Sequence, residues 1–311
     1  MSRLLPLVLL SAHLLGAPPV LTPAVTREDA LVLKSTGSLD RDAVPECSAL
    51  LASATQERVL WTLSDSDGPA RLVAIRPSGL VALPPTAGPG FGQKKYLGVD
   101  VVGARNLDWE ALASDGAGNL ILGDVGNNLS RRRELFLYVI PEPTVGAASV
   151  TPTRRLTFTW PDQVEFPDPE QSHDCEAMFW YRGKLHLLTK HRRDTRSRLW
   201  RAEIPSTASR AYLSPVGAFD AHGMVTDASV SPDGRHLAVL TYRLLWVFDI
   251  SRKPENPLTG PALARPLQPP VSQWQLEGCA WLDNETLILG SEEGGLFQVK
   301  LRELSAPVSE R

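Results

Sequence analysis

The chain has 311 residues, of which 43% are hydrophobic and 22% charged, and its formal net charge is −3. These fractions are typical of a globular protein and argue against disorder. Basic residues form only short groups, such as the one at 131–133, so composition gives no case for nucleic-acid binding. The length suits one large all-β domain, and 26 Pro and 23 Gly fit a fold with many turns.

The N-terminus has the pattern of a signal peptide. A positive start at Arg3 precedes an apolar run over residues 4–15, and Ala24 follows small residues at a plausible cleavage position. The run is too short to span a membrane comfortably, and no second candidate span follows. We therefore expect a signal peptide over 1–24, a mature domain over 25–311, and an exported protein, periplasmic or secreted. An uncleaved N-terminal anchor is the alternative.

One pattern recurs five times along the chain. Each copy opens with an acid and an apolar run, then has a turn, a second apolar run, a polar break and a third run; the opening acids are Glu46, Glu110, Glu176, Asp227 and Glu277. Successive acids are 64, 66, 51 and 50 residues apart. Several short strands repeated at this period predict a single all-β domain, a β-propeller. Five blades are preferred, with six as the alternative because the first two intervals have room for extra strands.

Turn residues and aliphatic runs predict the strands of each blade. Return strands are expected at 59–63, 120–122, 185–188, 237–240 and 287–289, and third strands at 70–75, 135–140, 199–204, 245–250 and 296–301. Fourth strands are expected at 155–160 and 212–219. The last copy lacks a fourth strand. Pairing it with the N-terminal segment 30–34 would close the ring and leave no open edge.

Strand direction brings the opening acids to one mouth of the predicted ring. Return strands run back to the same face, where they end at Asp65 and Asp67, Asp124, Lys190, Tyr242 and Glu292. Crowded carboxylates raise one another's pKa values or recruit a cation, and oxygen-only ligands favour calcium before magnesium. The candidate metal ligands are Glu46, Glu110, Asp124, Glu176, Asp227, Glu277 and Glu292.

The outer segments differ from blade to blade, and these differences suggest a substrate. Lys190, His191 and Arg192 form a positive cluster suited to a phosphate or carboxylate, and the other candidate substrate-binding residues are Asn127, Asn128, Tyr242 and Arg243. Candidate catalytic groups are Glu110, Glu176, Glu277 and His173, with His173 as general acid or base. The chain lacks a nucleophile elbow, a phosphate-binding glycine loop and a dinucleotide fingerprint.

Three functions fit this pattern. The first is a calcium-dependent hydrolase of a phosphorylated or other anionic small molecule. The second is a non-catalytic propeller that binds a ligand or a partner protein, with acids that hold adjacent blades together. The third is a glycosidase that uses two of the inner acids. In each case we expect a monomer without a membrane span.

Cysteine is scarce. Cys47, Cys175 and Cys279 each lie within two residues of an opening acid. In a closed ring the first and last blades are neighbours, so Cys47 and Cys279 could form a disulfide. The alternative is three buried free cysteines that pack as small apolar residues.

Two stretches resemble known propellers. Asp108-Trp109-Glu110, with residues 123–128 and 137–143, is similar to a segment of exported bacterial propellers of largely unassigned role. Glu277-Gly278-Cys279 followed by residues 290–296 resembles β-propeller phytases and phytase-like proteins. The resemblance implies calcium sites at the ring mouth, with Glu277, Glu292 and Glu293 as metal-side residues and Asp124 and Glu110 as further candidates. Phytases of this type are usually six-bladed and richer in acids and lysines.

Overall fold

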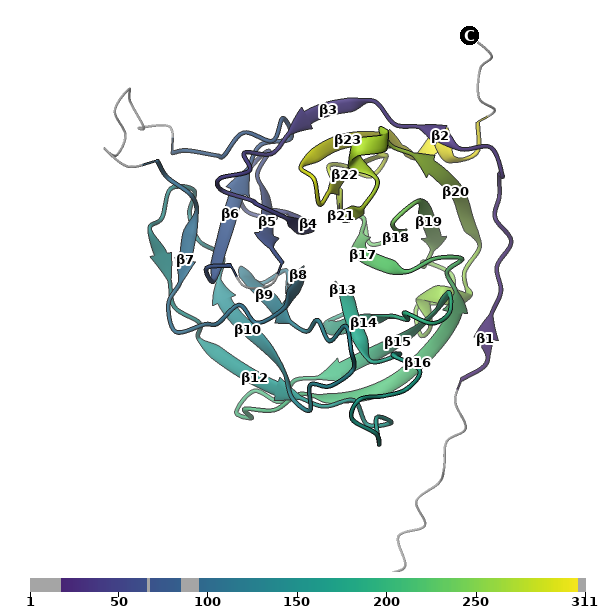
Figure 1. Cartoon of the computed structure of the whole chain (residues 1–311), viewed down its shortest axis with the longest axis horizontal. Coiled ribbons are helices and arrows are strands. Elements are labelled where there is room, and N and C mark those ends of the chain that lie inside the picture. The colour runs from purple at the N-terminus through teal and green to yellow at the C-terminus, as the bar shows by residue number, and fades with distance from the viewer. Residues whose placement is uncertain (1–17, 66–67, 85–94, 307–311) are drawn as a thin grey trace, which may run out of the picture.

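The computed structural model describes residues 18–65, 68–84 and 95–306. Within these ranges the chain forms a ring of five β-sheets and no α-helix, as Figure 1 shows. The predicted five-bladed propeller is confirmed, and the six-bladed alternative is not what the chain adopts. The predicted apolar run at 4–15 and Asp67 lie outside the described residues. No helix in the described part is long and apolar enough to cross a membrane.

Each blade consists of four antiparallel strands in sequence order from the axis outward, except at the closure. Blade 1 contains β4 (Cys47–Ala52), β5 (Leu60–Ser64), β6 (Arg71–Ile75) and β7 (Val99–Val101), and β11 (Ser149–Val150) adds to its outer edge. Blade 2 contains β8 (Trp109–Ser114), β9 (Asn119–Asp124), β10 (Leu135–Pro141) and β12 (Arg154–Phe158). Blade 3 contains β13 (Asp174–Tyr181), β14 (Lys184–Lys190), β15 (Arg196–Glu203) and β16 (Tyr212–Asp220).

Blades 4 and 5 complete the ring. Blade 4 contains β17 (Val225–Val230), β18 (His236–Thr241), β19 (Leu244–Asp249) and β20 (Ala262–Gln268). Blade 5 contains β21 (Leu276–Trp281), β22 (Thr286–Ser291), β23 (Gly295–Lys300) and, from the N-terminal region, β3 (Ser35–Ser38). Three short 3-10 helices lie outside the sheets: η1 (Pro257–Thr259), η2 (Val271–Gln273) and η3 (Leu301–Leu304).

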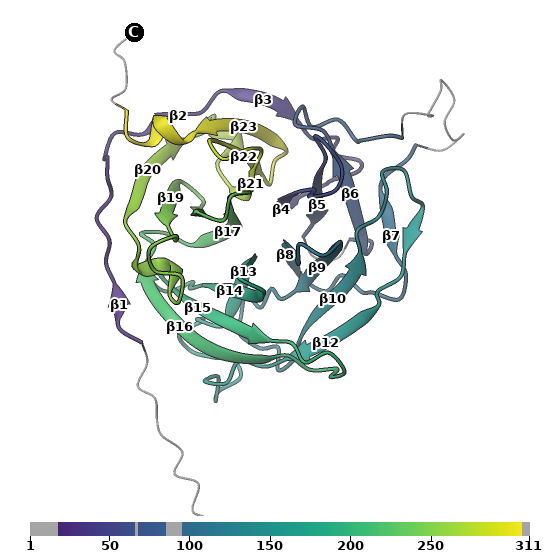
Figure 2. The same cartoon turned by 180° about the vertical axis from the view of Figure 1, so that it is seen from behind.

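The N-terminal region closes the ring, although five residues later than the sequence suggests. The closing strand is β3, which pairs antiparallel with β23, whereas the expected segment 30–34 contains β2 (Leu31–Val32), which pairs in parallel with β20. Further upstream, β1 (Val20–Leu21) pairs in parallel with β16. Residues 20–38 therefore form an N-terminal strap along the outer edges of blades 3, 4 and 5, as Figures 1 and 2 show from opposite sides.

Gly37 allows the closing strand to approach its neighbour. A Cβ atom at this position would lie 2.4 Å from the carbonyl oxygen of Ser78. Because Ser78 contributes backbone there, a side chain at residue 37 would displace the turn after β6. The closure therefore depends on glycine at this point.

The hydrophobic core consists of five clusters, each between two adjacent blades. The three cysteines are buried and free, and each lies in a different cluster. Cys47 packs between blades 5 and 1, whereas Cys279 packs between blades 4 and 5. The Cys47–Cys279 disulfide is therefore not formed, and the alternative of three buried small residues is what the structure has.

Candidate functional site

A β-bulge near the start of every inner strand decides which side chains are equivalent at the mouth. The pairing with the second strand skips one residue in each blade. The skipped residues are Ser48, Glu110, Glu176, Thr226 and Glu277. Bulges often re-aim a side chain beside a functional site. Acids therefore occupy the equivalent position in blades 2, 3 and 5 alone among the described strands, and hydroxyls occupy it in blades 1 and 4.

The predicted equivalence of the five opening acids is wrong at two of them. Glu46 precedes the bulge position of blade 1 by two residues and is exposed, and Asp227 follows the bulge position of blade 4. The sequence pattern of an acid followed by a small residue made these five acids look equivalent. A β-bulge adds one residue to a strand, and the sequence does not show where it lies.

Asp227 joins three blades. It is buried and accepts hydrogen bonds from the backbone N–H groups of Ala228 at 2.8 Å, Cys279 at 2.7 Å and Leu50 at 3.2 Å. Burial raises the pKa of its carboxyl, and the three donors oppose that rise. Both oxygens therefore have backbone partners, as expected for an acid that keeps blades 4, 5 and 1 in register. Its predicted role as a metal ligand stays a prediction.

The predicted positive cluster is already paired with acids. Lys190 and Glu176 are each 2% exposed, and the Lys190 Nζ lies 2.9 Å from the Glu176 carboxylate. Arg192 pairs with buried Asp174 at 2.8 Å and with Glu176 at 3.4 Å. Burial lowers the pKa of Lys190, but the Glu176 carboxylate and other charges raise it more, so Lys190 stays protonated.

The residues that follow β9 are also held by ion pairs and hydrogen bonds. Arg132 pairs with the buried Asp124 carboxylate at 2.9 Å. Asn127 donates its backbone N–H to Asp174 at 2.6 Å and its side-chain amide to the His173 carbonyl at 3.1 Å. Asn128 accepts a hydrogen bond from Arg192. These predicted site residues do meet at one end of the ring, where they mainly hold one another.

Three carboxylates from blades 1 and 2 approach one another closely at this mouth. One carboxylate oxygen from each of Asp65, Asp108 and Glu110 lies within 4.8 Å of the other two, so this acidic triad could hold a metal ion. Gly126 packs against Asp108, where a Cβ atom would lie 2.4 Å from the carboxyl carbon. The Ser48 hydroxyl donates to Glu110.

Crowding and burial shift the titration of this acidic triad. Burial, followed by the charges of Asp174 and Asp65, raises the pKa of Asp108 to about 7. Burial and the Glu176 charge raise the pKa of Glu110 well above its usual range. Asp108 was absent from the predicted ligands, although it stands two residues before Glu110. Asp108 is held close to Glu110 by hydrogen bonds between its backbone and residues 124–126. The sequence alone does not reveal these hydrogen bonds.

Glu277 forms the far side of the mouth. The Tyr242 side chain is hydrogen bonded to Glu277, and the Lys190 Nζ lies 4.8 Å from the centroid of the Tyr242 ring. Burial raises the pKa of Glu277 to about 8, although Lys190 opposes the shift. Glu292 is half-buried beside Gln275, which donates to its carboxylate, and exposed Arg243 lies over the Trp274 ring. Apart from Lys190 of blade 3, these residues come from blades 4 and 5 or the loop between them.

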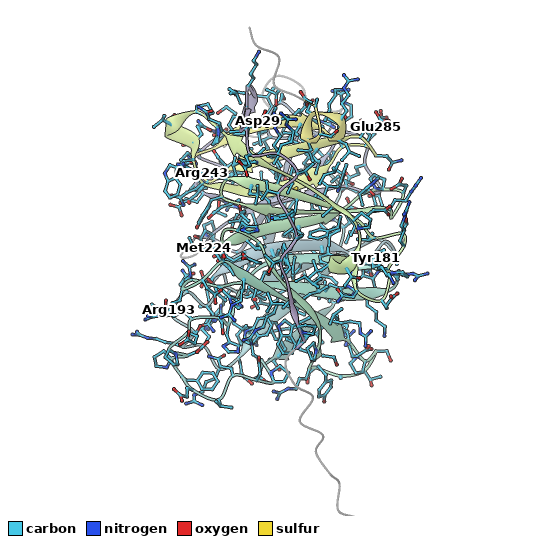
Figure 3. The ribbon with its side chains drawn as sticks, turned by 90° about the vertical axis from the view of Figure 1, so that its right-hand side faces the viewer. Asp29, Tyr181, Arg193, Met224, Arg243 and Glu285 are labelled. Carbon is cyan, nitrogen blue, oxygen red and sulfur yellow. The ribbon has the colours of Figure 1, made fainter. Side chains whose placement is uncertain are left out.

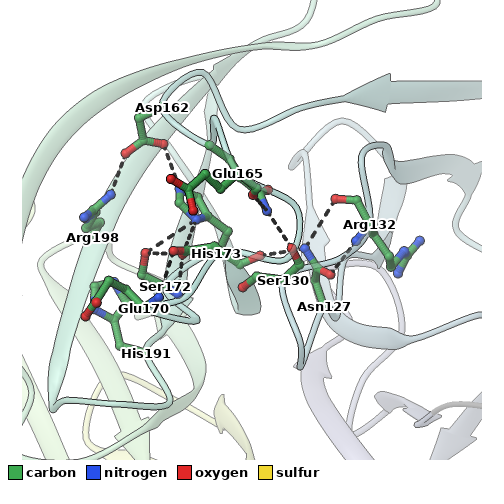
Figure 4. Close-up of polar contacts among 12 residues, drawn as sticks. Asn127, Ser130, Arg132, Asp162, Glu165, Glu170, Ser172, His173, His191 and Arg198 are labelled. Carbon is green, nitrogen blue, oxygen red and sulfur yellow. Dashed lines mark hydrogen bonds and ion pairs between the residues drawn. The ribbon is translucent and has the colours of Figure 1, made fainter.

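The two predicted histidines lie outside this carboxylate group, in the network of Figure 4. His173 is buried, with Nδ1 2.7 Å from Asp168 and Nε2 3.1 Å from Asp162. His191 is buried beside Asp194 at 3.0 Å, and burial lowers its pKa to about 4, so it is neutral near pH 7. The contacts anchor both rings among loops of blades 2 and 3, and their predicted catalytic and substrate-binding roles stay predictions.

Comparison with known proteins adds little to this geometry. No family model matches the chain, and no curated protein matches it. Among solved structures, the chain is similar to Sqt1 of Chaetomium thermophilum bound to the N-terminus of the ribosomal protein L10, with 17% identity and a TM-score of 0.36 over 62% of this chain and 45% of that chain. It is also similar to a chain in a structure of the mitotic checkpoint complex, with 13% identity and a TM-score of 0.38 over 82% of this chain and 64% of that chain.

These likenesses are too distant to bear on function. The chain spans less than half the length of the Sqt1 chain that it matches. The resemblance to β-propeller phytases gains no support from any match and stays a prediction. Function must therefore be argued from the mouth itself.

Proposed function

We propose that this protein is a non-catalytic binding propeller whose acidic mouth accepts a cation. The observation that carries the proposal is an imbalance of charge. Arg132, Lys190 and Arg192 each pair with a buried acid, whereas Asp108, Glu110 and Glu277 form no ion pair within the described residues. The remaining surplus is carboxyl groups whose pKa values are raised by burial and by neighbouring acids, and a bound cation would offset both effects.

Calcium is the cation that the donor set fits best. The acidic triad of Asp65, Asp108 and Glu110 offers oxygen ligands only, and no His or Cys of the described residues joins it. Hard oxygen donors and several carboxylates favour calcium, which accepts irregular geometry more readily than magnesium. The second carboxylate oxygen of Asp124 is buried without a hydrogen-bond partner, and its first oxygen accepts from the Asp108 N–H at 3.1 Å. An uncompensated acceptor beside the acidic triad is further support for a positive ligand.

Thermal unfolding with calcium and with a chelator tests the proposal. A site filled to about a hundred times its dissociation constant stabilises a fold by about 2.7 kcal/mol. For a domain of this size we expect a rise in Tm of about 5 to 10 °C. The rise should disappear in Asp108→Asn and in Glu110→Gln, and Tyr212→Phe, an exposed residue on β16, serves as the matched control. The same rise in both variants, or none in the parent protein, would contradict the calcium site.

The calcium-dependent hydrolase is the second candidate function. The observation in its favour is the acidic triad itself, because a metal held by three carboxylates keeps open positions for water and substrate. Its weakness is the substrate side, since the cations assigned to an anionic substrate are paired with acids. Turnover of 4-nitrophenyl phosphate that requires calcium and is lost in Glu110→Gln would favour the hydrolase over simple binding.

Export is proposed on the N-terminal sequence alone. The strap complicates the position of cleavage, because β1 at Val20–Leu21 precedes Ala24 and pairs with β16. Cleavage at Ala24 would remove β1 but keep the N–H groups of Thr26 and Arg27, which donate to the Ala264 carbonyl. N-terminal sequencing of the protein recovered from a secreting host decides between cleavage at Ala24 and cleavage upstream of β1. Retention of the full N-terminus inside the cell would contradict export.

A further inference from the structure

A cavity of about 920 Å³ lies at the end of the ring opposite the acidic mouth. The C-terminal ends of all five inner strands line it, whereas the acids stand at the N-terminal ends of these strands. Figure 3 shows the two ends of the ring, with Tyr181 on the side of this cavity and Arg193 and Arg243 on the acidic side. We call this opening the apolar mouth.

The apolar mouth has hydrophobic side chains at its floor and a rim that also carries serines and charged side chains. Leu112 and Met178 are buried at its floor, and Leu51, Trp180 and Leu282 are partly buried around it. Trp180 is partly buried against the core between blades 2 and 3 and also lines the cavity. A concave site of this volume is in the range that binds small molecules.

Two arginines stand on the rim, where Arg235 lies close enough to Asp233 for its charge to act on that carboxylate. Arg182 lies in the turn between β13 and β14, and Arg235 lies in the turn between β17 and β18 of the next blade. Both are exposed, and neither forms an ion pair or donates a side-chain hydrogen bond within the described ranges. Asp233 is the one acid among the described lining residues, and its carboxylate accepts from the Ser231 hydroxyl and the Arg235 backbone N–H.

We propose that the apolar mouth binds an organic anion with a flat apolar body. The body would lie against Trp180 and the aliphatic walls, and its carboxylate, sulfonate or phosphate group would accept hydrogen bonds from Arg182 and Arg235. Guanidinium groups are suited to such anions because their N–H groups can donate in parallel to two oxygens. Aromatic side chains supply large contact area at little cost in conformational entropy.

This site is independent of the cation proposed for the acidic mouth. The sequence had placed an anionic ligand at Lys190, His191 and Arg192, but those side chains are buried or paired. The free positive charge near a described cavity is instead at the opposite end of the ring. Failure of the calcium test would therefore leave the anion site untouched, and the reverse also holds.

A pair of matched dyes tests the proposal. 1-Anilinonaphthalene-8-sulfonate has the aromatic body and the anion, and N-phenyl-1-naphthylamine has the same body without the sulfonate. We expect the folded full chain to bind the sulfonate dye saturably, and Arg182→Gln/Arg235→Gln to weaken that binding by at least about tenfold, since hydrogen bonds between two charged groups are stronger than neutral ones. Affinity for the neutral dye should change less than about twofold.

Two controls separate this site from general dye binding. Arg210→Gln removes an exposed arginine that lies outside the cavity and donates to the Thr159 hydroxyl, and it should leave both affinities unchanged. Chelator and Glu110→Gln should also leave them unchanged, since the acidic mouth lies at the other end. Absence of saturable sulfonate binding, or an equal loss for both dyes in the double variant, would overturn the proposal.

Because both arginines are exposed, the double variant should keep its fold, which its Tm and circular dichroism check. If it does not fold, Arg235→Gln alone serves, with an expected loss of about fivefold for the sulfonate dye and none for the neutral dye. An unchanged sulfonate affinity in the single variant would then overturn the proposal.

Discussion

The two mouths of the ring are made by the same five strands, yet their chemistry is opposite. The acidic mouth stands where the inner strands begin and concentrates buried charge, including Glu110, Glu176 and Glu277. The apolar mouth stands where they end and has Leu51, Leu112 and Trp180 under two exposed arginines. A β-bulge distinguishes the two ends, because it turns one side chain per blade toward the acidic mouth.

This contrast shows that a charged side chain at a mouth is not necessarily free to bind a ligand, because it can already be paired within the protein. At the acidic mouth Arg132, Lys190 and Arg192 are paired with buried acids, and exposed Arg243 lies over the Trp274 ring. At the apolar mouth Arg182 and Arg235 form no ion pair within the described part of the chain, although Arg235 acts on the nearby Asp233 charge. Partners, rather than the number of charged residues, therefore indicate which ligand each end accepts.

The largest expected effect comes from removing the buried cation of the acidic mouth. Lys190→Met should lower the free energy of unfolding by about 3 to 5 kcal/mol, because it leaves the Glu176 carboxylate buried with a weaker partner. Urea unfolding measures the loss. The double variant Lys190→Met/Glu176→Gln should recover much of it. Exposed Arg243→Met is the control at the same mouth and should cost less than about 0.5 kcal/mol. A cost below 1 kcal/mol in Lys190→Met would mean that solvent already screens this pair.

A smaller effect separates structural acids from ligand-binding acids. Asp227→Asn should lower the free energy of unfolding by about 2 kcal/mol, because three backbone N–H groups lose a charged acceptor. The rise in Tm with calcium should be kept, since the acidic triad is intact. Loss of that rise in Asp227→Asn would place Asp227 among the cation ligands and undo the distinction.

Titration of Glu277 gives the acidic mouth a pH dependence that the apolar mouth lacks. Its pKa is raised from an ordinary value of 4.5 to about 8, so the folded state binds more protons than the unfolded state between these values. The free energy of unfolding should therefore fall as pH rises toward 8, by about 1 to 2 kcal/mol between pH 6.5 and 8.5. Unfolding with chelator present measures this slope, and Glu277→Gln should reduce it, whereas Asp108 and Glu110, whose pKa values are also raised, keep the rest. Arg235→Gln at the apolar mouth should leave it unchanged, and equal slopes in the parent and in Glu277→Gln would contradict the assignment.

The smallest effect is expected at Glu46. Glu46→Gln should change the free energy of unfolding by less than about 0.5 kcal/mol and keep the calcium response, because Glu46 is exposed and lies outside the bulge position. Glu110→Gln, with the same change of side chain, should abolish that response. If the two variants behave alike, the grouping of residues by the bulges is wrong.

Much of the fold could be predicted from local patterns. Turn residues and aliphatic runs located the return and third strands of all five blades, and the unpaired last copy implied closure by the N-terminal region. The closing strand was placed at 30–34 instead of at Ser35–Ser38 because Leu31 and Val32 look more strand-like than the sequence Ser-Thr-Gly-Ser. Hydrogen bonding to the exposed edge of β23, rather than β propensity, determines that strand.

The site could be predicted only in part. The end of the ring at which the acids lie could be predicted, because strand direction follows from the repeat. Glu110, Glu176 and Glu277 all occupy bulge positions at that end. Pairing could not be predicted, since nothing local shows that Lys190 faces Glu176. The apolar mouth was missed because its walls look like core residues in sequence. The one signal was the pair of arginines in hairpin turns at the same end of neighbouring blades.

The strap also imposes an order of events on the chain. Strand β3 is synthesised before blade 1, yet its partner β23 is synthesised only after the strands of blades 1 to 4. The same delay applies to β1 and β2, whose partners lie about 200 residues or more downstream, at Ala218 and Leu267. Local hairpins form quickly, whereas contacts between distant segments form slowly. The N-terminal strap is therefore expected to pair last. Until β3 pairs with β23, the outer edge of blade 5 stays open to pairing with another chain.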